Sequence, residues 1–444
     1  MTTALVAPGP RSHPITGHLS EFREDRLGFF TTCARQYGDR VALRLGWRPV
    51  LLLSHPDDIE AVLTNSRDFI KHWYLRLSAT ILGQGLLTSE GNFWLRQRRL
   101  AQPAFHRKRI ATYGEIMVAY AQRLIAAWQD GDTRDVHQDM LRLTMEIVAK
   151  TLFDTETGGE AERVGVAIDF LLATFDVRMS SLIPLPESIP TPTNIKLRRA
   201  VRQLDQIIYG FIQQRRTSSE DRGDLLSMLL HAQDEDDGSR MTDRQVRDEA
   251  LTIFLAGHET TALTMSWIWY LLSEHPPVEK QLMEELGTVL GGRAPTVDDL
   301  PRLKYTEMVV YEAMRLYPPA FVVGREAIHD CVVNGLQVPA GTTVLMSQWV
   351  VQRDPRFFVN PEQFQPERWA DGLAKRLPKY AYFPFGGGPR LCIGQSFALM
   401  EVALLLATIA QRFRLTLVPG HRVTPSALFT LRPKDGVRVT VQRR

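Results

Sequence analysis

The chain has 444 residues, of which 44% are hydrophobic and 23% are charged, a balance that allows a large globular core. Its net charge of +3, from 53 basic and 50 acidic side chains, argues against a nucleic-acid partner. The cysteines Cys33, Cys331 and Cys392 form no Cys-x-x-Cys pair, which argues against a structural zinc site and a disulfide framework.

The N-terminal and C-terminal parts of the chain carry strand patterns. The first residues, MTTALVAPGPRSHP, lack a charged region followed by an apolar one, so we expect a cytoplasmic protein without a membrane anchor. VALRL and VLLLS, separated by GWRP, predict a β-hairpin. Asn334-Gly335 predicts a second hairpin with a two-residue turn, and the segments FRLTLVP and VRVTVQ predict strands at the end of the chain.

Helical patterns dominate between about Trp94 and Tyr317. The apolar segment from Leu251 to Leu272 is long enough to span a bilayer, but His258, Glu259 and several threonines interrupt it, so we expect a buried helix through a large core. The sequence therefore predicts a mainly α protein with small β-sheets, and residues 1–444 are expected to form a single domain.

The stretch AGHETT lies in the middle of this long helix. Gly257 lowers helix stability, and burial of the Glu259 carboxyl group is costly unless the group is used. Thr260 lies four residues after Ala256, so its hydroxyl group can bond to the Ala256 carbonyl and locally disturb the helix.

Two further pairs of residues have helical spacing. Glu312 and Arg315 in YEAMRLYPP lie three residues apart and share one helix face, an arrangement that by itself is typical of a surface ion pair. Trp94 and Arg98 in WLRQRR lie four residues apart and also share a face.

The stretch FGGGPRLCIG, from Phe385 to Gly394, precedes a helical pattern. Cys392 therefore lies at or just before a helix N-terminus, where unpaired N–H groups favour a thiolate. The loop glycines leave room for a flat, bulky ligand, and Arg390 adds a cation beside them. A thiolate, a flat ligand and an anion together indicate haem with its two propionates.

The pattern Phe385-x-x-Gly388-x-Arg390-x-Cys392-x-Gly394 resembles the haem-binding signature of the cytochrome P450 family. The sequence motifs AGHETT, RDP and PERW are similar to those of bacterial members related to fatty-acid hydroxylases. The resemblance implies the cytochrome P450 fold, with haem between a long distal helix and a proximal cysteine-loop helix. It also implies that Cys392 is the iron ligand.

The resemblance assigns further roles. Arg98, Arg325 and Arg390 would pair with the haem propionates, since the arginine fork suits a carboxylate. Glu312 and Arg315, together with Arg368 of PERW, would form a buried network that supports the cysteine loop. The other residues expected to contact haem are Trp94, Ala256, Phe385 and Gly394.

The implied reaction is hydroxylation of an organic substrate, in which Glu259 and Thr260 would manage proton delivery during dioxygen activation. The implied cofactor is haem b, and O2 is the co-substrate. Only fifty residues follow Gly394, too few for a fused redox domain, so electrons from NAD(P)H are expected through a separate ferredoxin or flavodoxin with its reductase. A basic cluster is either the docking site for this partner or a solvated face: Arg96, Arg99, Arg107, Lys108 and Arg109.

The substrate is expected to be apolar. The family's pocket-lining segments correspond here to Trp73 to Leu87, Phe254 to Thr260, Ala320 to Val323, and Leu428 to Thr430, and their side chains are mostly apolar. A fatty acid fits this expectation, as does a terpenoid or steroid-like compound. A carboxylate substrate would need a cation at the channel mouth, for which the candidates are Arg48, Lys71 and Arg76.

Two alternatives to a monooxygenase are a haem-thiolate peroxygenase that uses hydrogen peroxide and a non-catalytic haem-binding protein. The presence of both Glu259 and Thr260 argues against each, because neither protein needs this acid–alcohol pair. One departure from the family pattern is Gln352 in QRDP, where many members have histidine. That position is expected to be structural.

Overall fold

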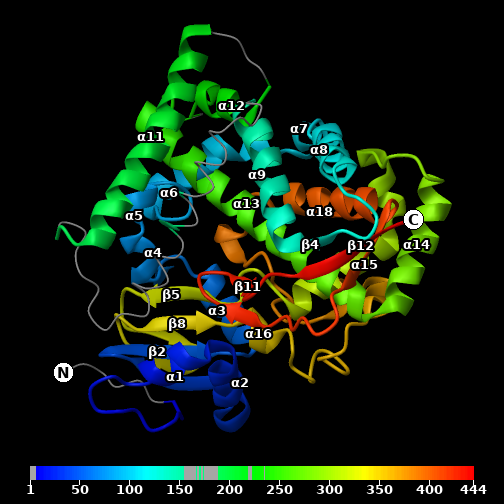
Figure 1. Ribbon diagram of the computed structural model, residues 1–444. Coiled ribbons are helices and arrows are strands. Elements are labelled where there is room, and N and C mark those ends of the chain that lie inside the picture. The colour runs from blue at the N-terminus through cyan, green and yellow to red at the C-terminus, as the bar shows by residue number, and fades with distance from the viewer. Residues whose placement is uncertain are drawn as a thin grey trace.

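The computed structural model describes residues 7–154, 167, 170–171, 174, 189–218, 223–234 and 236–444. It is mainly α-helical with small β-sheets, as the sequence predicts, and Figure 1 shows the helices gathered above and beside one sheet. The α-helices are α1 (Leu19–Glu24), α2 (Arg26–Tyr37), α3 (Pro56–Thr64), α4 (Trp73–Leu77), α5 (Ala79–Leu82), α6 (Gly91–Ala101), α7 (Arg107–Ala111), α8 (Gly114–Ala126), α9 (Val136–Phe153), α11 (Pro192–Ser218), α12 (Leu225–His231), α13 (Asp243–Glu274), α14 (Pro276–Leu290), α15 (Lys304–Leu316), α16 (Gln348–Val351), α17 (Leu373–Arg376) and α18 (Gln395–Ala410).

The largest sheet has the strand order β1-β2-β8-β5-β3. The pairing of β2 with β8 is parallel and the other pairings are antiparallel. The strands are β1 (Arg40–Leu45), β2 (Arg48–Leu53), β3 (Phe69–Lys71), β4 (Thr133–Asp135), β5 (Val323–Ala327), β6 (Cys331–Val333), β7 (Leu336–Val338), β8 (Thr343–Met346), β9 (Phe413–Leu417), β10 (Pro425–Ala427), β11 (Leu431–Pro433) and β12 (Arg438–Arg443).

Both predicted hairpins are confirmed. β1 pairs with β2 across the turn at residues 46–47. β6 pairs with β7 across Asn334 and Gly335, whose φ angles of 44° and 84° are both positive, as a type I′ turn requires. The predicted strands at the end of the chain also form, since β12 pairs with β9 on one side and with β4 on the other.

Helix α13 runs through the middle of the helical part (Figure 1). Its first turn is fixed by a capping box, in which Thr242 and Gln245 each satisfy a backbone N–H of the other. Most of its side chains are buried, including those of Trp267 and Met265, so it is an interior helix as predicted. Among the described residues, no helix combines the length and the apolar character needed to cross a membrane.

Helix α18 contributes to the same core as α13. Apart from Ala403, its residues from Met400 to Ala410 are buried, and the apolar ones pack in one cluster with side chains of α8, α9, α13 and α15. Burial of this much apolar surface, at about 25 cal/mol per Å², is the main stabilising contribution in the region. The N-terminus of α18 and the middle of α13 are therefore held in fixed positions.

Candidate active site and cofactor cavity

A partly open cavity of about 960 Å³ lies between α13, the start of α18 and the large sheet. It brings together all the residues that the sequence assigns to the site: Trp94, Arg98, Ala256, Glu259, Thr260, Arg325, Phe385, Arg390, Cys392 and Gly394. Most of the remaining wall is apolar. One cavity thus collects residues from segments up to 300 residues apart.

Cys392 faces this cavity from the loop that precedes α18. Its side chain is exposed, its backbone N–H donates to the Phe385 carbonyl at 3.1 Å, and α18 begins three residues later with Gly394 as its N-cap. The exposed surface of Cys392 faces the cavity, while the surrounding protein keeps the thiol away from bulk water. This burial raises the pKa of the Cys392 thiol, and the Gly394 N–H and the Arg98 guanidinium offset it only in part. The predicted stabilisation by the helix start is therefore outweighed, and a coordinated cation would favour the thiolate.

The glycines of the cysteine loop have different roles, which corrects the interpretation that all of them clear space for a ligand. A Cβ on Gly387 would come within 2.1 Å of the Tyr380 ring, and a Cβ on Gly388 within 2.1 Å of the Leu63 carbonyl oxygen. Gly386 has a φ of 71° and nothing within 4 Å of its Cβ position. Gly387 and Gly388 thus allow close packing within the protein, whereas Gly386 permits the turn and leaves open space.

Three arginines at one end of the cavity give it a positive charge that favours the binding of anions. Arg325 is 7% exposed, and burial lowers its pKa. Burial also lowers the pKa of Arg98. Among the residues described, none forms an ion pair with Arg98 or Arg325. Arg325 is buried and Arg98 is partly buried, and cations withdrawn from water without counter-ions are costly, so two carboxylates in this part of the cavity would stabilise it. The donor set therefore fits haem propionates, with Cys392 in place for the iron.

Arg390, the third of these arginines, already has protein partners. Its Nη1 donates to the Ser89 carbonyl at 3.0 Å, its Nη2 pairs with Glu90, and its guanidinium carbon lies 3.8 Å from the centroid of the Trp94 ring. Burial lowers the pKa of Arg390 to about 10. No motif in the sequence marks Glu90 as part of the site.

Lys71 is also part of this end of the cavity, which overturns its assignment to the channel mouth. It is 6% exposed, its Nζ donates to the Leu86 carbonyl, and burial lowers its pKa well below the ordinary value. It lies directly opposite Arg325 in the pairing of β3 with β5. That pairing of two distant short strands gives no signal in the sequence, so the position of Lys71 could not be predicted.

On the α13 side of the cavity, the predicted bond between Thr260 Oγ1 and the Ala256 carbonyl is present at 2.7 Å. The expected disturbance of the helix is wrong, because α13 continues without a break from Asp243 to Glu274. A threonine hydroxyl can share a carbonyl that still accepts its normal helical bond, since each carbonyl oxygen has two lone pairs.

Glu259 projects from the same turn and is 2% exposed. Its Oε1 accepts hydrogen bonds from Thr430 Oγ1 and Arg432 Nε, both at 2.6 Å. Arg432 also forms an ion pair with it. Nothing in the sequence around Glu259 indicates this partner, because Arg432 lies 173 residues away in β11. The carboxylate is thus buried, paired and next to the cavity.

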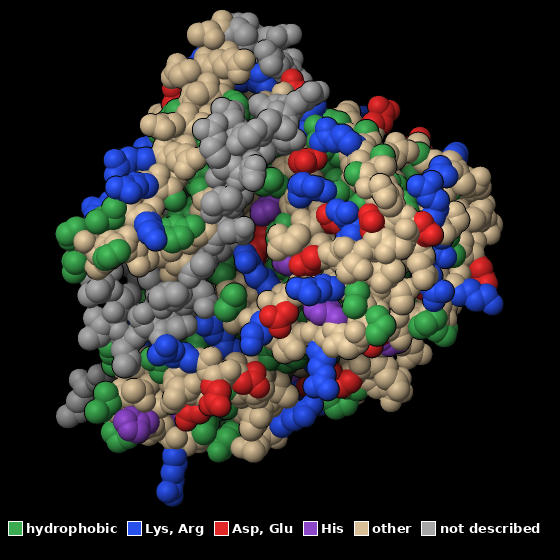
Figure 2. All heavy atoms as spheres, in the orientation of Figure 1, with side chains coloured by type: hydrophobic (Ala, Val, Ile, Leu, Met, Phe, Trp, Pro, Cys, Tyr) green, Lys and Arg blue, Asp and Glu red, His purple; other side chains and the backbone are tan. Residues whose placement is uncertain are grey.

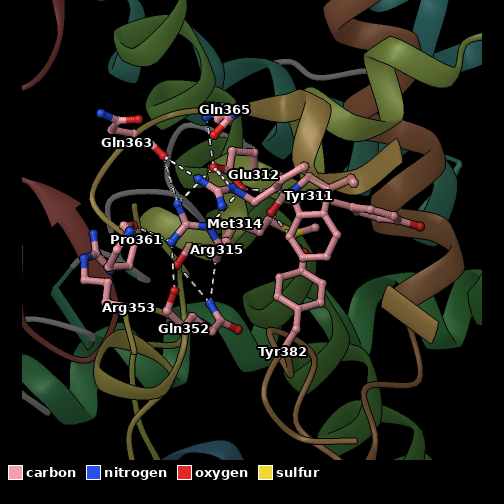
Figure 3. Close-up of polar contacts among 12 residues, drawn as sticks. Tyr311, Glu312, Met314, Arg315, Gln352, Arg353, Pro361, Gln363, Gln365 and Tyr382 are labelled. Carbon is pink, nitrogen blue, oxygen red and sulfur yellow. Dashed lines mark hydrogen bonds and ion pairs between the residues drawn. The ribbon is translucent and has the colours of Figure 1, made fainter. Parts of the chain in front are cut away.

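Glu312 and Arg315 form a fully buried pair rather than a surface one. Arg315 donates from Nε and Nη2 to the two Glu312 oxygens at 2.8 and 2.9 Å, and both side chains are 0% exposed. Arg368 Nε donates to Glu312 Oε1 at 2.8 Å, so the predicted three-residue network is confirmed. Figure 3 shows Glu312 and Arg315 of this network, with Gln352 near Arg315. Gln352 donates to the carbonyls of Met314 and Arg315, which confirms its structural position.

The family model for cytochrome P450 matches residues 7–441 of this chain. The chain is a cytochrome P450. Cyclooctatin synthase from Streptomyces melanosporofaciens is 38% identical over 96% of this chain and 93% of its own length. Cyclooctat-9-en-7-ol 5-monooxygenase from the same organism is 39% identical over 94% and 91%, and pentalenene oxygenase from Streptomyces avermitilis is 36% identical over 97% and 95%.

Solved structures agree with this assignment. The haem domain of a cytochrome P450 superposes with a TM-score of 0.89 at 28% identity, covering 100% of this chain and 99% of that one. A cyanobacterial member solved with retinoic acid bound gives a TM-score of 0.88 at 26% identity, with 100% of both chains covered. This cytochrome P450 is therefore a haem oxidoreductase of the monooxygenase family. The comparisons do not support the narrower likeness to fatty-acid hydroxylases.

The substrate-facing wall of this cytochrome P450 is close to the one expected. Residues 320–323 and 428–430 line the cavity. Phe254 does not, because its ring packs against Phe153 and His258 behind the wall. Of the expected channel cations, Arg76 is also outside the wall and pairs with Glu326. Arg48 does line the cavity, 4.0 Å from the centroid of the Trp73 ring.

The expected basic cluster of this cytochrome P450 is partly neutralised. Arg96 and Arg99 both pair with Asp234, at 3.2 and 3.6 Å, and Arg99 also pairs with Asp236 at 2.7 Å. Lys108 is exposed. The Arg107 side chain lies outside the described part. On the face shown in Figure 2, basic and acidic side chains are intermixed rather than gathered by sign.

Proposed function

We propose that this cytochrome P450 hydroxylates a terpenoid at a C–H bond. The observation that carries the proposal is the similarity, over more than nine tenths of the chain, to relatives named for cyclooctatin, cyclooctat-9-en-7-ol and pentalenene. The cavity supports it, because the wall contributed by Phe321, Val322, Leu428 and Phe429 is apolar. An apolar wall favours a hydrocarbon skeleton through burial of its surface.

The site residues have the following proposed roles. Cys392 ligates the haem iron, while Arg98, Arg325 and Arg390 pair with the propionates. The bound haem supplies the activation of dioxygen for insertion into a C–H bond. Glu259 and Thr260 handle protons on the α13 side, and the cavity wall excludes bulk water.

Electrons are proposed to come from NAD(P)H through a ferredoxin or flavodoxin with its reductase. Lys108 and Arg109 lie in α7, which contacts the α18 helix that follows Cys392, and they are the cations proposed for docking an acidic partner. Substitution of both by glutamate should weaken the dependence of the haem reduction rate on salt. An unchanged salt dependence would exclude these two residues from docking.

The substrate class is tested by titrating the purified ferric holoprotein. Cyclic terpenes and long-chain fatty acids are added separately, and the haem absorption band is followed. A saturable low-spin to high-spin shift with terpenes, followed by detection of a hydroxylated product in an NADPH-driven reaction with a reductase and ferredoxin, is the expected result. A shift with fatty acids alone would contradict the proposal.

A matched pair of variants separates the two substrate classes further. Arg48 lines the cavity, so Arg48→Gln should weaken binding of a carboxylate but leave terpene binding unchanged. Arg23 is exposed on α1, and Arg23→Gln controls for a general change in charge. Product formed from hydrogen peroxide without a reductase, at a rate equal to the NADPH-driven reaction, would instead favour the peroxygenase alternative.

The proton role of Thr260 is tested with Thr260→Val, which keeps the shape of the side chain and removes its hydroxyl group. The expected result is continued NADPH consumption with a product yield at least about tenfold lower, since a positioned proton-transfer group contributes roughly 10²–10⁴-fold. Thr264→Val, one helical turn away on the same helix, is the control. Equal yields from the two variants would exclude the role.

A further inference from the structure

Glu90 stands at the start of α6 but its side chain bonds to residues outside that helix. It is the N-cap residue of α6, with a φ of −134° and a ψ of 169°, yet its side chain makes no capping hydrogen bond. Glutamate is not among the preferred N-cap residues, which are mainly those with short side chains such as Ser, Thr, Asp and Asn. The Glu90 carboxylate instead bonds to partners outside α6.

Those partners belong to segments far away in the sequence. Glu90 Oε1 accepts from the Lys71 backbone N–H at 2.8 Å, at the end of β3. The second oxygen pairs with Arg390 of the cysteine loop. The negative charge of Glu90 also acts on Lys71 and Arg325, where it opposes the pKa-lowering effect of burial.

The carboxylate therefore lies among cations that would otherwise repel one another. Lys71 and Arg325 are directly opposite each other in the β3–β5 pairing, and like charges in that arrangement are destabilising. Arg390 contributes a further repulsion to each of them. Glu90 is the acidic residue that contacts two of these segments at once, and its side chain is only 23% exposed.

The contacts with Glu90 neutralise the charge of Arg390 and also fix the orientation of its side chain. With Nη2 held by Glu90 and Nη1 by the Ser89 carbonyl, the guanidinium lies on the Trp94 ring in one orientation. A planar guanidinium that is already oriented loses less entropy when it binds a carboxylate. Glu90 thus acts on the haem site through Arg390.

We propose that Glu90 is a positioning residue of the haem site, which orients Arg390 and, through its negative charge, lowers the reduction potential of the bound haem. A fixed anion near the propionate-binding cations stabilises the more positively charged, ferric state. The inference rests on haem binding, which the family supplies, and is independent of the terpenoid proposal.

The test uses substrate-free holoprotein, so failure of the terpenoid proposal does not affect it. The variant Glu90→Gln keeps the size of the side chain and one acceptor oxygen but removes its negative charge. Expected results are a more positive ferric/ferrous midpoint potential in spectroelectrochemical titration and faster transfer of haem to apomyoglobin. Glu115→Gln, the same change at an exposed residue of α8, should leave both quantities at their wild-type values.

Two further variants separate positioning from a general packing effect. Glu90→Asp keeps the charge but is too short to reach both partners, so its potential should return toward wild type while haem transfer stays fast. In an Arg390→Gln background, Glu90→Gln should have a much smaller effect on haem transfer. If Glu90→Gln holds too little haem for a potential, this loss supports the positioning role and Glu90→Asp supplies the potential.

Two results would overturn the proposal. One is a midpoint potential of Glu90→Gln equal to that of the Glu115→Gln control. The other is an effect of Glu90→Gln on haem transfer that is the same with and without Arg390, since a residue acting through that arginine cannot act equally in its absence.

Discussion

Replacement of Glu312 by glutamine should be among the most destabilising single-atom changes in this protein. The carboxylate is 0% exposed and accepts five hydrogen bonds. They come from Arg315 Nε and Nη2, Arg368 Nε, Trp369 Nε1 and the Gln365 backbone N–H, at 2.8 to 3.0 Å. An amide in its place has one acceptor oxygen instead of two, and no charge.

The cost follows from which donors lose their acceptor. The amide nitrogen would best replace Oε2, which accepts only from Arg315 Nε and Trp369 Nε1. These two buried donors would then face an N–H group and have no acceptor. Each unsatisfied donor costs about 1–3 kcal/mol. Breaking a buried ion pair costs about 3–5 kcal/mol in total. Glu312→Gln should therefore lower the free energy of unfolding by about 4 kcal/mol.

The measurement is urea unfolding of the holoprotein, followed by far-UV circular dichroism and by haem absorbance, with coincidence of the two transitions as the check on two-state behaviour. Glu307→Gln, on the same helix, is the matched control. Its carboxylate is exposed, 3.7 Å from Lys304 and 3.0 Å from the Tyr311 hydroxyl, so its loss should cost less than about 1 kcal/mol. A difference between the two variants below about 1 kcal/mol would refute the reasoning.

Three further predictions concern the cavity and α18. Cys392→Ser should abolish the thiolate spectrum of the reduced carbon monoxide complex and with it NADPH-driven hydroxylation. Arg432→Gln leaves Glu259 without its ion-pair partner and should lower product yield per NADPH at least about tenfold, measured by product analysis. Burial raises the pKa of Glu401 from 4.5 to about 8, so stability should fall as pH rises through that range. Glu401→Gln should flatten this dependence and stabilise the protein at pH 7 by up to about 3 kcal/mol, measured by urea unfolding.

Each of these predictions has an outcome that contradicts it. A thiolate spectrum in Cys392→Ser would mean that another residue ligates the iron. Arg438→Gln, at an exposed position of β12, should be neutral, and a yield in Arg432→Gln equal to it would exclude a role for the ion pair. Unchanged pH dependence in Glu401→Gln would mean that the carboxyl group is ionised in the folded protein.

The parts of the molecule that the sequence predicts well are those set by local chemistry. Asn334-Gly335 specifies its hairpin because both residues tolerate positive φ. The bond from Thr260 to Ala256 follows from helical spacing alone. The cysteine loop is recognisable because its glycines, arginine and cysteine lie within ten residues and each has a specific chemical use.

The parts that could not be predicted depend on pairings between distant segments. Nothing in the neighbourhood of Glu259 indicates that Arg432 is its partner, since that contact exists only after β11 packs against α13. Lys71 looks like a solvated cation in the sequence and becomes buried only because β3 pairs with β5. In the sequence Arg96 belongs to a basic cluster, whereas in the structure Asp234, which lies 138 residues away, neutralises it.

The packing of Gly387 against Tyr380 and of Gly388 against Leu63 has a consequence for how the cofactor is acquired. These contacts are made by the polypeptide itself, so the cysteine loop has its shape before haem arrives. The Tyr380 hydroxyl strengthens this by accepting from the Gly388 N–H at 3.2 Å. Haem then enters a preorganised receptor, and little of its binding free energy is spent on ordering the loop. Transplanting the ten-residue loop into another scaffold would consequently require Tyr380 and Leu63 to be transplanted with it.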